Sequence, residues 1–278
     1  MIRSNVGRCP ISAQCRILGV AKSTYYWMLD HPETERADPH EEDVGRVWCD
    51  SGRVYEAGKI KAVLEHERIV MSRRRINRIM KAGGAWRARI RGPGTGRIRP
   101  GRTTIRPRTS SAANSMATPP RTHIAADPAY VRVGNSWACI CLPGDLANRE
   151  ITGHAVGTRH DADLVLAAFA ALRFPLGGIE VFHADRGGGF AGERAERMLD
   201  AFGITRFLSN PGSPYDNAVV ESTNRLVKKE LIYDNVYTSV ERLRSDLNRY
   251  VWWYNHQRLH STLGYLSPVE FTQQGKTL

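Results

Sequence analysis

Three carboxylates stand at positions from which they could act together on one reaction. Asp127 precedes the alternating stretch AYVRV, which predicts a strand, and Asp185 follows the short apolar stretch IEVF, which predicts another. Glu221 lies early in a predicted helix. Carboxylates just beyond strand ends point into the crevice where open α/β sheets bind ligands. We therefore expect the three side chains to meet at one edge of a sheet.

Such a trio suits phosphoryl transfer. Carboxylates held a few ångströms apart repel each other unless a divalent cation neutralises them, and their oxygen atoms suit Mg²⁺ or Mn²⁺. Two such ions, about 3.5–4 Å apart, can activate an attacking oxygen and stabilise the leaving oxygen of a phosphodiester. The pattern thus predicts a site for two ions. The alternative is three unrelated acids, because any chain of this size carries acids at strand ends.

The predicted helix that carries Glu221 also carries two cations on the same side. Arg225 and Lys228 follow Glu221 at i+4 and i+7, so the three side chains share one face, beside an apolar stripe. Cations next to a metal-binding carboxylate would hold a DNA end so that its phosphate meets the ions. The alternative is an ordinary Glu–Arg pair on a helix surface, worth a few tenths of a kcal/mol.

The positive charge is concentrated in one part of the chain. The formal net charge is +12; residues 1–120 hold 23 Lys and Arg against 11 Asp and Glu, whereas residues 121–278 hold 17 of each. Within residues 86–108, eight arginines alternate with glycine and proline, and no acid is present. Such a segment cannot pack as a core element, but its arginines, Arg89 and Arg91 among them, can lie along phosphates and release counterions. We expect a linker that contacts nucleic acid; a merely solvated tether is the alternative.

Two pairs of helices are predicted ahead of this linker. Residues 11–29 read as two short helices around a turn at Gly19, a pattern typical of a helix-turn-helix. In the second pair, residues 72–82 begin at a capping serine and carry an apolar stripe. The other face of that helix is cationic and could grip the rim of a DNA groove. Its basic residues are Arg73, Arg74, Arg75, Arg78 and Lys81.

From about residue 119 the sequence pattern changes, and segments that predict strands alternate with segments that predict helices. The order from there is βββαβαβα, with a hairpin signal at Gly134-Asn135 and a long final helix over residues 239–254. This order predicts an α/β architecture, a mixed sheet with helices packed on it. The predicted organisation is a helical DNA-binding region at 1–85, an Arg/Gly/Pro-rich linker at 86–118 and an α/β core with a C-terminal helix at 119–278.

Composition excludes several classes of protein. A chain of 278 residues with 41% apolar residues can fill a core, which argues against collagenous or wholly disordered chains. Its longest apolar run, nine residues, is too short to span a membrane, and no secretory signal pattern begins the chain. Five cysteines without CxxC spacing indicate reduced thiols rather than disulfides or zinc ligands. We expect a cytoplasmic protein with no membrane partner.

Three stretches of the C-terminal half resemble a known family. HADRGGGF, GITRFLSNPGSPYDNAVVESTNRLVKKEL and NRYVWWYNHQRLHSTLGYLSPVEF are similar to the transposases of bacterial insertion sequences that share the retroviral-integrase catalytic core. The likeness is to the second-frame product of the frameshifting insertion-sequence group and covers roughly residues 11–272. Thirty-five residues lie between Asp185 and Glu221, which is the spacing between the second and third catalytic acids of that family.

The resemblance implies a ribonuclease-H-like fold in which Asp127, Asp185 and Glu221 bind two Mg²⁺ or Mn²⁺ ions. It also implies that the protein cuts double-stranded DNA at element ends and joins the freed 3′-hydroxyls to target DNA, as a homo-oligomer on paired ends. By position, Tyr215 and Asn217 would line the loop beside the site.

Two other functions stay open at the sequence level. Pro128 follows the first acid and removes a backbone donor, and Pro143-Gly144 interrupts a strand that is continuous in the family. The first alternative is therefore an inactive or decayed copy that only binds DNA. The second is a ribonuclease acting on RNA–DNA hybrids, which does not explain the basic first 120 residues.

Overall fold

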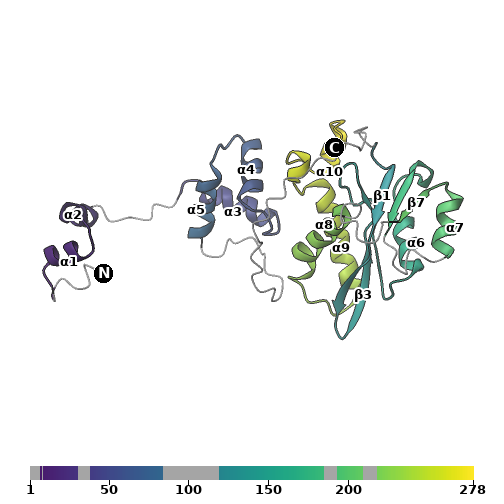
Figure 1. The fold of residues 1–278 in the computed structure, drawn as a ribbon, viewed down its shortest axis with the longest axis horizontal. Coiled ribbons are helices and arrows are strands. Elements are labelled where there is room, and N and C mark those ends of the chain that lie inside the picture. The colour runs from purple at the N-terminus through teal and green to yellow at the C-terminus, as the bar shows by residue number, and fades with distance from the viewer. Residues whose placement is uncertain (1–6, 8, 31–37, 84–118, 185–192, 209–217) are drawn as a thin grey trace.

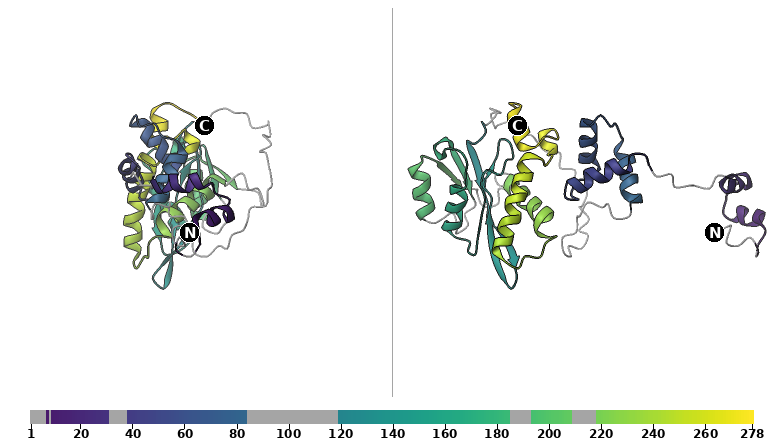
Figure 2. Two further views of the ribbon diagram at one scale, coloured as in Figure 1. Left: turned by 90° about the vertical axis from the view of Figure 1, so that its left-hand side faces the viewer. Right: turned by 180° about the vertical axis from the view of Figure 1, so that it is seen from behind.

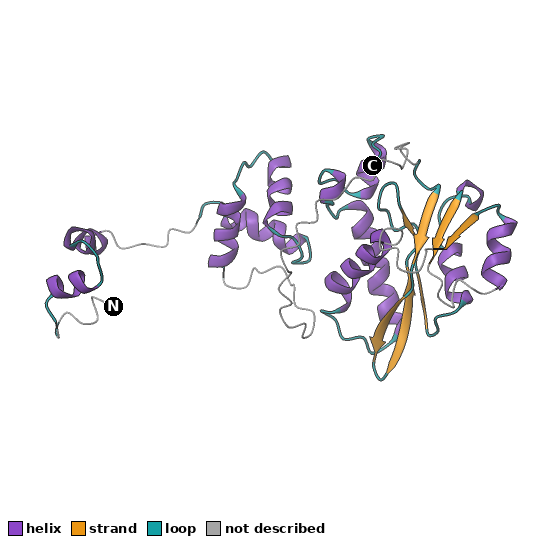
Figure 3. Ribbon diagram, viewed as in Figure 1, coloured by secondary structure: helices purple, strands orange, loops and turns teal. Residues whose placement is uncertain are grey.

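The chain folds into an all-α N-terminal part and an α/β C-terminal part (Figure 3). The computed structural model describes residues 7, 9–30, 38–83, 119–184, 193–208 and 218–278. The linker predicted at 86–118 lies outside these described residues.

The first two helices form the pair that the sequence predicts. Helix α1 spans Ile11–Ile17 and α2 spans Lys22–Asp30. Between them Gly19 has a φ of 63°, a left-handed conformation that glycine adopts without steric cost. The pair lies apart from the other helices (Figure 1).

Three further helices form a small unit with its own apolar core. Helix α3 spans Glu41–Asp50, α4 spans Ala57–His66 and α5 spans Arg73–Ala82. The last two match the predicted pair, and the Ser72 side chain caps α5 by accepting a hydrogen bond from the Arg75 backbone. Helix α3 is not predicted from the sequence. Its buried face, together with Ile60, Leu64 and Ile76, fills the centre of the unit.

Within the described residues of the α/β part, the chain forms seven short strands. Their bounds are β1 His123–Ala126, β2 Ala129–Val133, β3 Ser136–Cys141, β4 Gly144–Asp145, β5 Ala155–Gly157, β6 Val181–Ala184 and β7 Thr205–Leu208. One sheet has the order β4-β1-β6-β7, with β1, β6 and β7 parallel, and the other has the order β2-β3-β5 and is antiparallel. Strand β1 is not predicted from the sequence, and its presence means that Asp127 follows one strand and precedes another.

The β1–β4 pair of one sheet and the β2–β3 pair of the other follow one continuous antiparallel register. Ile124 of β1 pairs with Asp145 of β4, and five residues further along, Ala129 of β2 pairs with Ile140 of β3. The pairing therefore stays in step across the gap, with no residue inserted. Pro128 is expected to break the strand, and the break lies at Asp127–Pro128, which in this register face Leu142 and Cys141. The pairing keeps its register on both sides of the break.

Helices cover both sides of these strands (Figure 1). Helices α6, Ala162–Ala170, and α7, Glu193–Ala201, pack on one face, and α8, Ala218–Val227, and α9, Val240–His256, pack on the other. A π-helical turn, Lys228–Ile232, continues α8, and α10, Pro268–Gln273, ends the fold. Two apolar clusters, one on each face, hold the layers together. The predicted mixed sheet flanked by helices and preceded by helices is thereby confirmed.

The α3–α5 unit is joined to the end of the chain, as the view from behind in Figure 2 shows. The Tyr55 hydroxyl donates to the Gln257 carbonyl at 3.1 Å and accepts from the Leu259 backbone N–H at 2.8 Å. The Leu259 side chain is buried in the core of the unit, with Trp253 and Tyr265 packed against it. Residues near the C-terminus thus complete the core of a helical unit near the N-terminus.

All five cysteines are free thiols, as the sequence predicts. Among the residues that the structure describes, no helix is both long and apolar enough to cross a membrane.

Candidate active site

Asp127 lies at the break between β1 and β2, half-buried at the carboxyl end of β1. The neighbouring strand β6 runs parallel to β1, with Ala126 paired to Ala184. The residues that follow these two alanines are Asp127 and Asp185. Two of the predicted acids thus come directly after residues that pair across adjacent parallel strands; Asp185 itself lies outside the described residues.

Helix α8 packs against this strand end through a buried asparagine. Asn224 donates from its side-chain nitrogen to the Asp127 carbonyl at 2.8 Å and makes a longer contact, 3.4 Å, to the Asp127 carboxylate. Because Asn224 follows Glu221 by three residues, the two side chains lie on neighbouring parts of one helix side. Glu221, in the first turn of α8, is exposed. Sequence reasoning missed Asn224; its i+3 spacing from Glu221 is the signal that could have identified it.

The side chains around Asp127 favour an oxygen-binding metal over a sulfur-binding one. Burial, reinforced by the negative charge of Asp127, raises the pKa of the nearby Cys141 thiol to about 12. The thiol of the metal-free chain therefore stays protonated at neutral pH. The carboxylate oxygens of Asp127 and Glu221 are the donors that Mg²⁺ and Mn²⁺ prefer. Within the described part of the chain, no group of three His, Cys, Asp or Glu side chains forms a metal site.

The two cations predicted beside Glu221 lie on the same helix and on the π-helical turn that continues it. Arg225 is exposed in the last turn of α8, and Lys228 begins the π-helical turn. Tyr215 and Asn217, predicted to line the adjacent loop, lie outside the described residues, as do Arg89 and Arg91.

The cationic face of α5 is partly engaged within the protein. Arg75 binds Asp38 through two hydrogen bonds, 2.9 and 2.7 Å, and Arg78 lies 3.4 Å from the same carboxylate. These contacts hold the pKa of Asp38 well below its usual value. Arg73 donates to the Tyr265 hydroxyl at 3.1 Å, whereas Arg74 is exposed. The face is therefore less free to contact DNA than its sequence suggests.

The carboxylates of Asp127 and Glu221 lie on a fold in which helices cover both faces of the strands. The family described as "Integrase core domain" matches residues 117–214 and again residues 202–268. The chain is 31% identical over 268 residues to a protein named as the transposase for insertion sequence element IS986/IS6110 of Mycobacterium tuberculosis, covering 90% of this chain and 94% of that protein.

Other relatives have the same kind of name. The transposase for insertion sequence element IS629 of Shigella sonnei is 27% identical, over 97% of this chain and 92% of that protein. Among solved structures, the chain is similar to the HTLV-2 integrase catalytic core domain in complex with magnesium, with 13% identity and a TM-score of 0.45, covering 56% of this chain and 98% of that one. The chain belongs to the family of bacterial insertion-sequence transposases with an integrase-type core, and its general function is DNA transposition.

Proposed function

We propose that this transposase cuts double-stranded DNA at the ends of its element and joins the freed 3′-hydroxyls to target DNA by metal-dependent phosphoryl transfer. Asp127, Asp185 and Glu221 would hold two Mg²⁺ or Mn²⁺ ions. The observation that carries the proposal is the pairing of Ala126 with Ala184, together with the Asn224 bond that ties α8 to Asp127. These contacts support a common location for the three acids.

The protein residues would act by binding and orientation. When bound, the ions would supply a nucleophile-activating and charge-stabilising function that carboxylates alone lack. Asn224 would fix the carboxylate of Asp127, and the exposed carboxylate of Glu221 would complete the donor set from the helix. Arg225 and Lys228 would bind backbone phosphates, with Arg74, Arg89, Arg91, Tyr215 and Asn217 as further DNA contacts, and two DNA ends would be held by a homo-oligomer.

The two prolines do not support the alternative that this chain is an inactive copy that only binds DNA. The break at Asp127–Pro128 leaves the ladder in register on both sides, so the strand end that carries Asp127 keeps its place in the sheet. A hydrolase of RNA–DNA hybrids remains testable by supplying hybrid and duplex substrates side by side.

The proposal is tested with the full chain and a labelled duplex carrying the terminal repeat of its element. In Mg²⁺, Asp127→Asn and Glu221→Gln should each lower cleavage by at least about 1000-fold, the equivalent of about 4 kcal/mol of transition-state stabilisation, while duplex binding is retained. Glu241→Gln is the matched control, since Glu241 is exposed in the first turn of the next helix, α9. Cleavage that survives in Glu221→Gln, or that is unaffected by a chelator, would overturn the proposal.

A further inference from the structure

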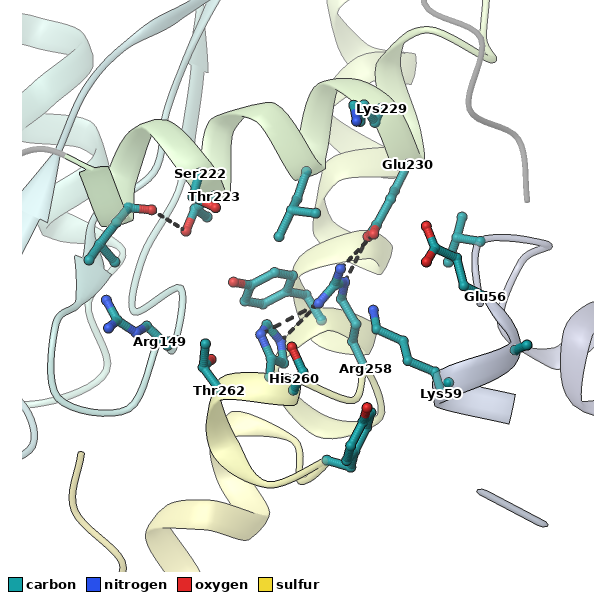
Figure 4. Close-up of a pocket in the computed structure, with 18 of the residues that line it drawn as sticks. Glu56, Lys59, Arg149, Ser222, Thr223, Lys229, Glu230, Arg258, His260 and Thr262 are labelled. Carbon is teal, nitrogen blue, oxygen red and sulfur yellow. Dashed lines mark hydrogen bonds and ion pairs between the residues drawn. The ribbon is translucent and has the colours of Figure 1, made fainter. Parts of the chain in front are cut away.

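A cavity of about 800 Å³ opens between the α3–α5 unit and the α/β part. Its wall on the α8 side includes Val219, Ser222, Thr223 and Leu226. These residues recur at three- and four-residue intervals, so they share one face of the helix, and that face is opposite to the face that carries Glu221. The cavity is thus a second region, separate from the candidate active site, and Figure 4 shows the residues that line it.

Basic side chains dominate the lining. Two carboxylates, Glu56 and Glu230, are present, against five cationic side chains that come from five separate segments of the chain. The cations are Lys59, Arg73, Arg149, Lys229 and Arg258. A concentration of positive charge from segments so far apart in sequence creates a field that attracts an anion.

One of the two carboxylates, that of Glu230, already accepts hydrogen bonds from other side chains of the protein. Glu230 accepts hydrogen bonds from Arg258 at 2.8 and 2.6 Å and from the Tyr250 hydroxyl at 2.8 Å. Arg258 and Glu230 therefore neutralise each other and leave the remaining four cations with Glu56 alone. In the described residues, neither Lys59 nor Arg149 forms an ion pair with a carboxylate.

The charge surplus affects the groups inside the cavity. Burial, with a further contribution from the charge of Arg258, lowers the pKa of Lys59 to about 8. Burial, followed by the charges of Arg258 and Lys59, likewise lowers the pKa of His260 to about 2. Burial itself disfavours a charge of either sign, but the part of both shifts that comes from neighbouring cations means that these cations would stabilise an anion there.

Arg149, which lines the cavity, has an unusual backbone conformation. Its φ is 66°, a left-handed value that costs a residue with a side chain about 1 kcal/mol. The turn before it is fixed by the Asp145 side chain, which accepts from the backbone N–H groups of Arg121 at 2.6 Å and Ala147 at 2.9 Å. Figure 4 shows Arg149 reaching the cavity from this loop on one side and Lys59 from α4 on the other.

We propose that this cavity binds phosphate groups of the DNA backbone, with Lys59 and Arg149 as their main cationic contacts. The hydroxyls of Ser222, Ser261 and Thr262 also line it and are donors of the kind that contact phosphates. Because Lys59 belongs to the helical unit and Arg149 to the α/β part, a bound DNA strand would bridge the two. The inference rests on the proposed function only in taking DNA as the substrate.

The salt dependence of DNA binding tests the proposal directly. The full chain is titrated with a fluorescent duplex at salt concentrations between about 50 and 200 mM, where each phosphate contact adds about 0.9 to the slope of log affinity against log salt. Lys59→Gln and Arg149→Gln should each reduce the slope by about 1, and the double variant by about 2. Lys61→Gln is the matched control: it removes the same charge from the same helix, but Lys61 is paired with Glu65.

A second readout uses the pKa of Lys59. Binding by the wild-type chain should weaken between pH 7 and pH 9, as the Lys59 ammonium of the free protein loses its proton, and this loss should be smaller in Lys59→Gln. Replacement of a desolvated ammonium by a neutral amide leaves no buried charge without a partner, so we expect the variant to fold; its thermal melt checks this.

Two outcomes overturn the inference. The first is a slope in Lys59→Gln that equals that of Lys61→Gln; the second is an identical pH profile in wild type and Lys59→Gln. Either result leaves the proposed function intact if Glu221→Gln still abolishes cleavage. A wild-type chain that binds no duplex at all would overturn both.

Discussion

Helix α8 and the π-helical turn that continues it form one helical rod, which carries a glutamate on each of two sides. The two glutamates differ in exposure and in hydrogen bonding. Glu221 is exposed on the side that packs toward Asp127, whereas Glu230, nine residues later, has only 10% of its side chain exposed. Arg258 and Tyr250 satisfy Glu230 with three hydrogen bonds. A carboxylate saturated by protein donors stabilises the fold, and an exposed one keeps its lone pairs for a ligand. Both glutamates have basic residues nearby in the sequence, Arg225 after Glu221 and Lys229 before Glu230, so the local sequence does not separate the two cases.

The largest difference between the two glutamates should be in stability. Glu230→Ala leaves Arg258, of which 4% is exposed, as a buried charge without its partner, and this should lower the free energy of unfolding by about 3–5 kcal/mol. Glu221→Gln should change it by less than about 0.5 kcal/mol, since exposed positions tolerate substitution. Urea denaturation of both variants measures the difference.

A double substitution sharpens the comparison. Replacing the pair together, Glu230→Leu with Arg258→Met, removes both charges and should recover most of the loss, because apolar side chains of similar volume can replace a buried ion pair. Similar stabilities for Glu230→Ala and Glu221→Gln would mean that the two sides of the rod do not differ as described.

Asn224 should have a smaller effect, and on activity more than on stability. Loss of its hydrogen bond to Asp127 in Asn224→Ala should lower cleavage about 10- to 100-fold, the usual cost of removing a group that orients a metal ligand. The free energy of unfolding should fall by only about 1 kcal/mol.

The dependence on metal concentration separates positioning from a general structural defect. If Asn224 orients Asp127, the Mg²⁺ concentration for half-maximal cleavage should rise in Asn224→Ala. Asn235→Ala is the control, because Asn235 also donates to a backbone carbonyl, that of Leu231 at 2.7 Å, but at an exposed position. An unchanged Mg²⁺ requirement would contradict a positioning role.

The smallest predicted effect is a dependence of the free energy of unfolding on pH, caused by His260 in the cavity. Burial and the charge of Arg258 lower the pKa of His260 to about 2, so the folded chain keeps this imidazole neutral while the unfolded chain protonates it near its ordinary pKa of about 6.5. The contribution of the neutral His260 side chain to the free energy of unfolding is complete above this ordinary pKa and is lost as the pH falls below it. It should amount to about 1 kcal/mol between pH 7 and pH 5.5.

Comparison of wild type with His260→Gln isolates this contribution. The wild-type free energy of unfolding should fall more steeply with decreasing pH than that of the variant, as measured by urea denaturation at each pH. Parallel pH profiles would show that His260 is not held neutral in the fold.

Local sequence signals predict the elements whose stability is local. The β2–β3 hairpin, the capped helix α5 and the long helix α9 all appear near their predicted bounds, because turn residues, a capping serine and apolar periodicity act within a few residues. Strand β1 was missed because it has four residues and no alternation of its own; its place is set by pairing with β6, nearly sixty residues later.

The site was predictable only in part, for a related reason. Chain spacing and strand ends identify Asp127 and Glu221 as candidates, but the bond from Asn224 to Asp127 joins residues 97 apart. The Arg258–Glu230 pair joins residues 28 apart across two elements. Whether an exposed-looking charge on a helix ends up in solvent, in a buried pair or in a cavity depends on which elements pack beside it, and no local pattern records that choice.

The bonds between Tyr55 and the stretch at Gln257–Leu259 have a consequence for biosynthesis. The partners lie up to 204 residues apart, and Leu259 belongs to the core that α3, α4 and α5 build. Synthesis must therefore proceed 204 residues past Tyr55 before the helices α3, α4 and α5 receive this apolar neighbour. A chain that ended before Leu259 would leave the α3–α5 unit without part of its apolar core, although all three helices had been made.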